Sequence, residues 1–307
     1  MEWYYFKPSD TLYFKGAEPM AIGVDHEASS VFPPSLQTLT GSLRTAILMQ
    51  NELSVQDYYN GKIDDKFLAI LGPSDGVAGF QVSGPLLNDG KQKYIPAPYN
   101  WYYDKDSGDS IIVAENITGT YPFKTSGKNI LWAKKGEPLG GKWIPVSVLS
   151  SLRVKKEDIK SLDCFFEYES RTGIALDYSK SKRVKNGHIY TADHIRLKTD
   201  CQLCWAVDVS LPIDSKGILF LGGEKRLGAY ERKNEEALSV SKNHSGLYMT
   251  LSPVEGNERI NNVVYATGKL QYFGGWDMKK RFHKPMIGYY PAGTVFSEKI
   301  DTACVAL

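Results

Sequence analysis

Short β-type segments recur along this chain, and few stretches have the spacing of a helix. Alternating or clustered apolar residues next to turns rich in Gly, Pro or Asn predict strands at residues 67–71, 80–87, 111–115, 165–168, 201–211 and 248–253. A chain with many strands and few helices favours an α+β fold, in which helices cover one face of antiparallel sheets.

The clearest helix is predicted at residues 36–48. Pro33-Pro34-Ser35 forms a helix start, and apolar residues follow at helical spacing. Gly41 interrupts this pattern at a cost of about 1 kcal/mol relative to Ala, which indicates that something packs close to the helix backbone. Arg44 shares a face with Gly41, and with nearby hydroxyl side chains it suits a phosphate contact. A satisfied surface arginine is the simpler interpretation.

Residues 221–228 combine glycines, one acid and two adjacent cations. Glycine allows a positive φ and a close approach of the backbone to another molecule, and successive N–H groups in such a bend can form an anion site. Lys225 and Arg226 stand next to Gly222 and Gly223, where they can neutralise an anion. The acid between them is expected to orient the cations or to cap the loop. A tight turn with solvated charges is the alternative.

Two further basic segments follow from the sequence. Lys280 and Arg281 belong to a run of cations interleaved with an aromatic residue, which is typical of phosphate or base contacts. A basic loop before residue 186 is closed by Asn186-Gly187 and lies between two β-like segments. It predicts a projecting hairpin that turns at Asn186-Gly187, with a solvated charge run as the alternative.

Composition limits the remaining possibilities. A chain of 307 residues fits one large or two ordinary domains, and we place a boundary near residue 160, which gives domains 1–160 and 161–307. The net charge is only +2, so a nucleic-acid surface requires local segregation of charge. No secretory signal or membrane span is found, and a cytoplasmic location is expected.

A metal site or other cofactor is not expected from the sequence. Cys201 and Cys204 form a CxxC pair, but on a strand they point to opposite faces and would not share a metal ion. The five histidines lack the spacing of metal ligands.

Six motifs together resemble subunit three of the type III-B (Cmr) CRISPR interference complex, a member of the repeat-associated mysterious protein (RAMP) superfamily. In order they are DTLYFKGAEPM at 10–20, TGSLRTAIL at 40–48, VSGPLL at 82–87 with YIPAP at 94–98, ESRTGIA at 169–175 with HIY at 188–190, LGGEKR at 221–226 and PAGTVF at 291–296. The resemblance implies two ferredoxin-like (RNA-recognition-motif-like) domains with antiparallel sheets and sizeable insertions. The Gly-rich loop would lie in the C-terminal one.

The resemblance also implies a non-catalytic RNA-binding subunit that acts in antiviral defence. Such a subunit holds the 5′ repeat-derived tag of the guide CRISPR RNA, and it docks the large polymerase/cyclase-like subunit and the backbone RAMP subunit. With the basic run included, the expected RNA-binding residues are Gly41, Arg44, Arg171, Gly222, Gly223, Lys225, Arg226, Lys280 and Arg281.

Two alternatives stay open. A metal-independent endoribonuclease of the same superfamily, which processes CRISPR RNA, would need a general acid or base. His26, in the loop before the predicted helix, is the candidate. A purely structural assembly subunit would leave the basic loops solvated. RNA cleavage that disappears in His26→Ala would favour the endoribonuclease. Guide RNA retention that is unchanged by Arg44→Ala and Arg226→Ala would favour the structural assembly subunit.

Overall fold

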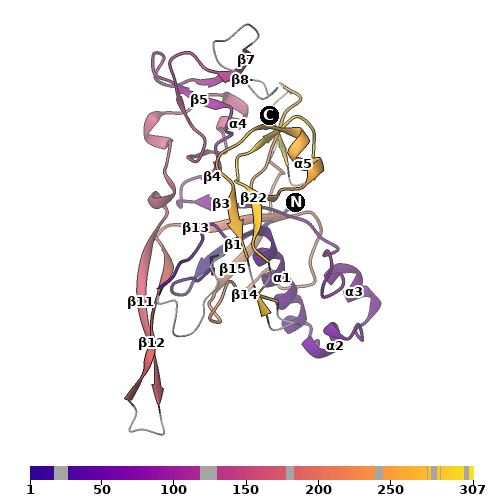
Figure 1. The fold of residues 1–307 in the computed structure, drawn as a ribbon. Coiled ribbons are helices and arrows are strands. Elements are labelled where there is room, and N and C mark those ends of the chain that lie inside the picture. The colour runs from indigo at the N-terminus through magenta and orange to yellow at the C-terminus, as the bar shows by residue number, and fades with distance from the viewer. Residues whose placement is uncertain are drawn as a thin grey trace. The chain divides into compact units, whose positions relative to one another are not determined.

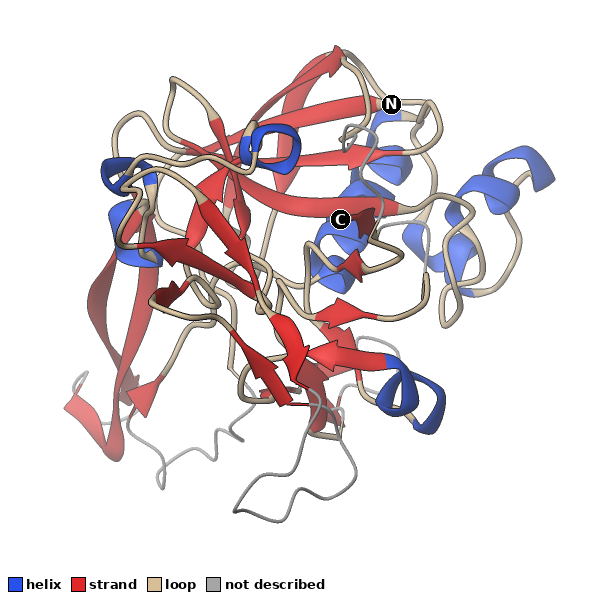
Figure 2. Ribbon diagram, turned by 90° about the horizontal axis from the view of Figure 1, so that it is seen from above, coloured by secondary structure: helices blue, strands red, loops and turns tan. Residues whose placement is uncertain are grey.

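A computed structural model describes residues 1–16, 27–117, 130–177, 183–238, 245–274, 276–277, 282–283, 285–300 and 304–307. Strands predominate over helices (Figure 2), which confirms the predicted α+β character with antiparallel sheets. The chain forms two compact units, each built from separate segments. Unit 1 contains Met1–Gly90, Phe165–Glu235 and Tyr272–Gly288, and unit 2 contains Lys91–Cys164, Glu236–Gln271 and Tyr289–Leu307. The division of the chain into residues 1–160 and 161–307 stays a prediction, since each of these units draws on segments from both halves.

The main sheet of unit 1 has the strand order β3-β13-β1-β15-β14 (Figure 1). Neighbouring strands in it are antiparallel. Trp3 and Tyr4 are adjacent on the central strand and point to opposite faces, and both are buried. The central strand is therefore covered on both faces. The bounds are β1 (Glu2–Pro8), β3 (Val82–Asn88), β13 (Gln202–Val207), β14 (Lys216–Phe220) and β15 (Leu227–Asn234).

Helix α1 (Leu36–Gln50) packs against this sheet and begins where the sequence predicts. The Ser35 side chain caps it by accepting a hydrogen bond from the backbone N–H of Thr38 at 3.3 Å. Leu39, Leu43 and Ile47 recur at helical spacing and are fully buried. The predicted helix is therefore confirmed.

The strand predicted at residues 67–71 is wrong, because these residues lie in helix α3 (Asp65–Leu71), which follows α2 (Val55–Tyr59). The Asp64 side chain caps α3 by accepting a backbone N–H of the first turn at 2.9 Å, and Gly72 ends the helix with a φ of 67°. A run of so few apolar residues has no period that separates a strand from a helix. The caps at Asp64 and Gly72 favour the helix over the strand.

β11 (Phe166–Asp177) and β12 (Arg183–Leu197) form a long antiparallel ribbon in unit 1 (Figure 1), and β2 (Glu27–Ala28) pairs with β12 in parallel. The predicted hairpin exists, but the turn predicted at Asn186-Gly187 is wrong, because both residues lie inside β12. Burial of residues at the base of the ribbon fixes the register of the strands, and this outweighs the local turn preference of an Asn-Gly pair.

Unit 2 consists of short strands and short helices. β5 lies between β6 and β9, β4 pairs with β10, β7 pairs with β8, and a further sheet has the order β18-β23-β16-β24. The bounds are β4 (Lys93–Pro96), β5 (Trp101–Asp104), β6 (Ile111–Val113), β7 (Glu115–Ile117), β8 (Ile130–Trp132), β9 (Gly136–Pro138), β10 (Trp143–Pro145), α4 (Val148–Ser151), β16 (Tyr248–Met249), β17 (Val254–Glu255), α5 (Glu258–Val263), β18 (Val264–Ala266), β23 (Val295–Phe296) and β24 (Val305–Ala306).

The remaining elements are small. They are the 3-10 turns at Lys156–Asp158 and Leu162–Cys164, and the strands β19 (Gln271–Phe273), β20 (Trp276–Asp277), β21 (Phe282–His283) and β22 (Ile287–Tyr290). Among the helices that the structure describes, none combines the length and the apolar character needed to cross a membrane.

Candidate nucleic-acid interface

The Gly-rich segment forms the turn between β14 and β15. The backbone N–H of Leu221 donates to the carbonyl of Arg226 at 2.9 Å, and the N–H of Arg226 donates to the carbonyl of Gly223 at 3.1 Å. Glu224 and Lys225 lie between them with φ values of 54° and 53°. Two consecutive left-handed residues are typical of a type I′ turn, which Asn and Gly adopt more readily than Glu and Lys.

Gly222 fixes this turn to the segment that follows β1. It has a φ of 87°, and a Cβ at this position would lie 2.4 Å from the carbonyl oxygen of Tyr13, so only glycine fits. The N–H of Gly223 donates to the same carbonyl at 2.8 Å. The N–H groups of Gly223 and Arg226 thus bond to backbone carbonyls within the chain. They are not available to bind an anion, although the sequence suggested such a site.

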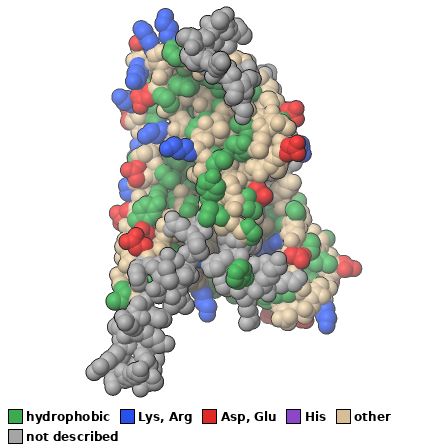
Figure 3. Space-filling view, in the orientation of Figure 1, with side chains coloured by type: hydrophobic (Ala, Val, Ile, Leu, Met, Phe, Trp, Pro, Cys, Tyr) green, Lys and Arg blue, Asp and Glu red, His purple; other side chains and the backbone are tan. Residues whose placement is uncertain are grey.

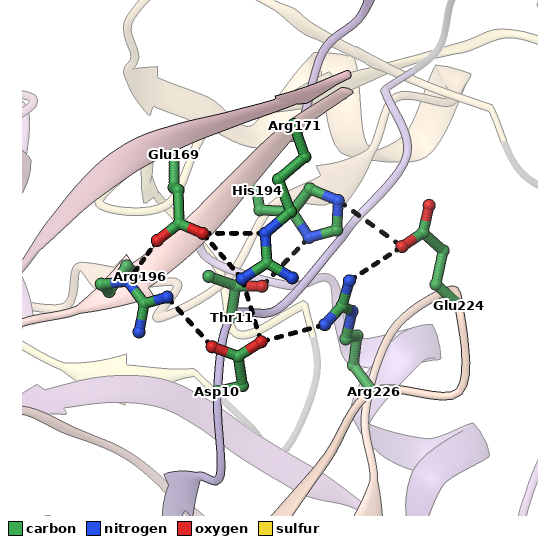
Figure 4. Close-up of polar contacts among 8 residues, drawn as sticks. All are labelled: Asp10, Thr11, Glu169, Arg171, His194, Arg196, Glu224 and Arg226. Atoms are coloured by element: carbon green, nitrogen blue, oxygen red, sulfur yellow. Dashed lines mark hydrogen bonds and ion pairs between the residues drawn. The ribbon is translucent and has the colours of Figure 1, made fainter. Parts of the chain in front are cut away.

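Three arginine side chains converge on one carboxylate beside the turn (Figure 4). The Asp10 carboxylate accepts hydrogen bonds from Nη2 of Arg171 at 2.9 Å, Nη2 of Arg196 at 3.0 Å and Nη1 of Arg226 at 3.2 Å. The Asp10 side chain is 46% exposed, so these bonds form at the protein surface. They join three segments, because Arg171 and Arg196 lie on the two strands of the ribbon and Arg226 ends the Gly-rich turn.

Two further carboxylates complete this group, which we call the arginine cluster. Glu169 accepts hydrogen bonds from Nε of Arg171 at 2.8 Å and from Nε of Arg196. Glu224 accepts one from Nη2 of Arg226 at 3.1 Å, so the acid in the turn orients a cation as predicted. Three guanidinium groups face three carboxylates, and the cluster is electrically balanced when His194 is neutral.

The ion pairs shift the pKa values of the groups in the cluster. Hydrogen bonds from Arg171, and then from Arg196, hold the pKa of the Asp10 carboxyl below its ordinary value. Bonds from Arg196 and Arg171 lower the pKa of Glu169 in the same way. The Glu169 carboxylate in turn raises the pKa of both guanidinium groups.

His194 lies beside these ion pairs and is only 1% exposed. Its Nδ1 is 3.1 Å from the Thr11 hydroxyl, and its Nε2 is 3.5 Å from Glu224. The ring of Tyr13 packs against it with centroids 5.3 Å apart. Burial lowers the pKa of the imidazole, although the Glu224 carboxylate opposes this shift. The ring therefore supports Thr11 and Glu224 and is closed to a substrate.

The structure brings Arg171 close to Arg226 at the end of the Gly-rich turn, since both bind the Asp10 carboxylate. Lys225 is exposed at the tip of the turn. Within the part of the chain that the structure describes, its side chain has no ion pair or hydrogen bond. On the face drawn in Figure 3, the Lys and Arg side chains lie among Asp and Glu side chains. The charge of Lys225 is thus not balanced by a carboxylate among the described residues, whereas the charges of the clustered arginines are.

Gly41 and Arg44 make other contacts. Arg44 donates from Nε to the carbonyl of Leu71 and from Nη2 to that of Gly76, both at 2.8 Å, and so holds the segment after α3 against α1. Gly41 is exposed, and a Cβ there would have no atom within 4 Å, so the predicted neighbour is absent among the described residues. Lys280, Arg281 and the alternative candidate His26 lie outside the described residues.

Sequence reasoning missed three members of the cluster, Asp10, Glu169 and Arg196, and also the neighbouring His194. Glu169 and Arg171 are two apart on β11, and His194 and Arg196 are two apart on β12, so each pair points to one face of its strand. This polar alternation was the available signal. It has meaning only when the strands are paired in the correct register and Asp10 is brought beside them.

Comparison with known proteins decides the family. The model of the family described as CRISPR-associated protein (Cas_Cmr3) matches residues 4–255. This chain belongs to that family. The resemblance to subunit three of the type III-B (Cmr) complex is thereby confirmed, and the chain is a CRISPR-associated protein of the Cmr type. Among curated proteins, no sequence matches it significantly.

Two solved structures are similar to this Cmr3-family chain in fold. A chain of "Type III-B Cmr-beta bound to cognate target RNA and AMPPnP, state 1" has a TM-score of 0.60 at 17% identity, with 96% of this chain and 85% of that chain covered. A chain of "Type III-B Cmr-beta bound to cognate target RNA" has a TM-score of 0.58 at 18% identity, with 96% and 86% covered. At these identities the likeness concerns the fold.

Proposed function

We propose that this Cmr3-family chain is a non-catalytic RNA-binding subunit of a type III-B CRISPR ribonucleoprotein. In this proposal the arginine cluster and Lys225 contact the backbone of the 5′ repeat-derived tag of the guide RNA. The observation that carries it is the convergence of Arg171, Arg196 and Arg226 on the half-exposed carboxylate of Asp10. Guanidinium forks that hold a carboxylate also suit a phosphate.

The charge balance of the cluster sets how RNA would bind. A cluster without net charge has little long-range attraction for RNA. A phosphate must therefore bind at the exposed edge of the cluster, or it must displace the Asp10 carboxylate from the guanidinium groups. Lys225, which is exposed at the tip of the turn, supplies the uncompensated charge. Contacts of this kind position the backbone and do not read the base sequence.

We extend the proposal to the domain architecture. In unit 1 the order along the chain is β1, α1, β3, β13 and β15, and the sheet order β3-β13-β1-β15 is that of a ferredoxin-like split βαβ fold. In chain order β14 takes the place of the second helix of that fold, and it extends the sheet beside β15. A second ferredoxin-like domain, and the division of the chain at residue 160, stay predictions.

The partners in this proposal are the guide RNA, the large polymerase/cyclase-like subunit and the backbone RAMP subunit. RNA cleavage stays an alternative whose candidate, His26, lies outside the described residues; the described His194 is 1% exposed and closed to a substrate. A purely structural assembly subunit is the stronger second candidate. The balanced ion pairs favour it, since they would also serve as a brace between the ribbon, the segment after β1 and the Gly-rich turn.

Co-purification with a guide RNA that carries a photoreactive nucleotide at its 5′ end tests the proposal. The chain should crosslink to this end within the complete complex. The triple variant Arg171→Ala, Arg196→Ala and Arg226→Ala should reduce the crosslink by roughly tenfold or more, since each lost phosphate contact weakens binding. Arg153→Ala is the matched control, because Arg153 is a surface arginine that pairs with Asp109 in unit 2. Equal crosslinking in all forms would favour the structural assembly subunit.

A further inference from the structure

Strand β14 is the last strand at one end of the main sheet of unit 1. It pairs with β15 on one side, and no strand of the described chain lies on its other side. Helix α1 packs against β14, and the Leu219 side chain is fully buried, so the strand is held in its extended conformation. An edge strand of this kind is a template that can pair with a further strand.

The hydrogen bonds at the two ends of the β14–β15 pair show how the backbone groups of β14 point. The N–H of Arg232 donates to the carbonyl of Ser215 at 2.7 Å, and the N–H of Leu221 donates to the carbonyl of Arg226 at 2.9 Å. Hydrogen-bonded residues of an antiparallel pair alternate with residues that are not hydrogen-bonded to each other. Residues 215, 217, 219 and 221 therefore face β15. The outward backbone groups belong to Lys216, Ile218 and Phe220.

The outward N–H and C=O groups match another polypeptide. None of the hydrogen bonds within the described chain uses them. Each of the three residues offers one donor and one acceptor, and a second extended chain offers the complementary groups at the same spacing of about 7 Å between alternate residues. A phosphate backbone offers acceptors only, and it would leave the outward carbonyl oxygens unpaired. The free edge therefore suits a protein strand better than RNA.

Side chains beside the free edge narrow the chemistry of that strand. Lys216 and Ile218 lie on the face of β14 opposite to Leu219, and their side chains are 74% and 59% exposed. On β15, Glu231 pairs with Lys216 at 2.9 Å, and the exposed Ala229 lies opposite Ile218. Cross-strand neighbours of complementary chemistry stabilise a sheet. An added strand would thus place an apolar side chain beside Ile218 and an acidic one beside Lys216.

We infer that β14 accepts an extended segment of another protein subunit, which adds to the sheet as a further strand. The segment carries apolar and acidic side chains at alternate residues. The inference rests on the proposed function, because that subunit belongs to the same ribonucleoprotein. β14 ends at Phe220 and leads directly into the Gly-rich turn, so the added strand also holds the strand that carries Lys225.

Ile218→Pro tests the pairing in the complete co-expressed complex. Proline removes the outward N–H, and it leaves the bonds of Gly217 and Leu219 to β15 in place, as is usual for proline on an edge strand. The amount of this subunit recovered with the complex should fall by about tenfold. Ile218→Val keeps the N–H and should retain full recovery. Circular dichroism of the isolated variants shows whether they fold, and equal recovery of two folded variants overturns the inference.

Amide hydrogen exchange tests the same pairing in the wild-type protein. In the isolated chain, the amides of Lys216, Ile218 and Phe220 should exchange faster than those of Gly217 and Leu219. In the complete complex, the three outward amides should become protected by about a hundredfold. Guide RNA alone should leave their exchange unchanged. Unchanged exchange in the complex overturns the inference, and so does equal protection by guide RNA alone.

A photoreactive amino acid in place of Lys216 identifies the occupant. A crosslink to a contiguous segment of another protein subunit supports the inference. A crosslink to RNA, a crosslink only to a second copy of this chain, or no crosslink overturns it. If the arginine variants leave the guide crosslink unchanged while the outward amides are protected in the complex, the proposed RNA contact fails and the strand pairing stands.

Discussion

The carboxylate of Asp10 accepts a hydrogen bond from Nη1 of Arg226 at 3.2 Å, across 216 positions of the chain. This bond joins the segment that leaves β1 to the turn between β14 and β15. The same carboxylate binds both arginines of the ribbon. The Gly-rich turn is therefore fixed by ion pairs as well as by the main-chain bond from Gly223 to Tyr13. This geometry is compatible with a structural brace and with an RNA-binding site. The stability and RNA affinity of variants distinguish the two.

Asp10→Asn should separate stability from RNA binding. The neutral amide loses charge-assisted bonds to three arginines, so unfolding should become easier by about 1 kcal/mol, a modest value because solvent screens these half-exposed pairs. RNA affinity should rise about fivefold, because removal of a negative charge about 5 Å from a phosphate is worth roughly 1 kcal/mol in a water-like dielectric. Thermal unfolding and fluorescence anisotropy with guide RNA measure the two effects. A parallel loss of stability and affinity would show that the carboxylate does not compete with RNA.

Lys225→Gly should stabilise the folded chain and lower its affinity for RNA. Glycine adopts the left-handed conformation of this position without strain, which should raise the free energy of unfolding by about 1 kcal/mol. The salt dependence of RNA binding should fall by about one unit of slope, because one cation is lost. Lys225→Gln is the control, since it loses the charge and keeps the strain. Unchanged RNA affinity in both variants would remove Lys225 from the interface.

Arg44→Ala should act mainly on stability. Its guanidinium donates to the carbonyls of Leu71 and Gly76, and loss of these bonds should cost about 1–3 kcal/mol in denaturant unfolding. RNA affinity of the folded fraction should change less than about twofold, because the Arg44 donors are engaged by these two carbonyls. A large loss of affinity at unchanged stability would instead assign Arg44 to the RNA interface.

Stability should rise with pH in two windows. The folded-state pKa values of Asp10 and Glu169 are lowered, so their contribution is present at neutral pH and is lost as the pH falls below about 4 toward the lowered values. Burial also lowers the pKa of His194, so the unfolded state takes up its proton first and stability falls as the pH drops below about 6.5. Melting temperatures between pH 8 and 3 should show both windows. His194→Gln should abolish only the upper one, and a wild-type protein without an upper window would contradict burial of a neutral ring.

Local signals explain what could be predicted from the sequence. Helix α1 was predictable because its cap, Ser35, and its buried residues lie within one short segment. The ribbon was predictable as a hairpin, but its turn was not, since burial at its base overrides the preference of Asn186-Gly187. The β-like run at 67–71 failed because capping by Asp64 decided in favour of a helix.

The arginine cluster required tertiary information. Arg171 and Arg226 were expected at the interface because of their motifs, whereas Arg196 lies in no motif and reaches Asp10 only through the register of β11 and β12. The carboxylates of Asp10 and Glu169 were likewise hidden, because they pair with arginines that strand pairing brings beside them. Motifs thus included part of the arginine cluster, and strand pairing supplied its remaining members.

The salt dependence of guide RNA binding tests the central claim most directly. The slope of log Kd against log salt concentration should be measured for the wild-type chain and for Arg171→Ala, Arg226→Ala and Arg153→Ala. If the arginine cluster contacts phosphates, each of the first two variants should lower the magnitude of the slope by about one, and Arg153→Ala should leave it unchanged. Equal slopes for all four proteins would contradict an RNA contact at the cluster.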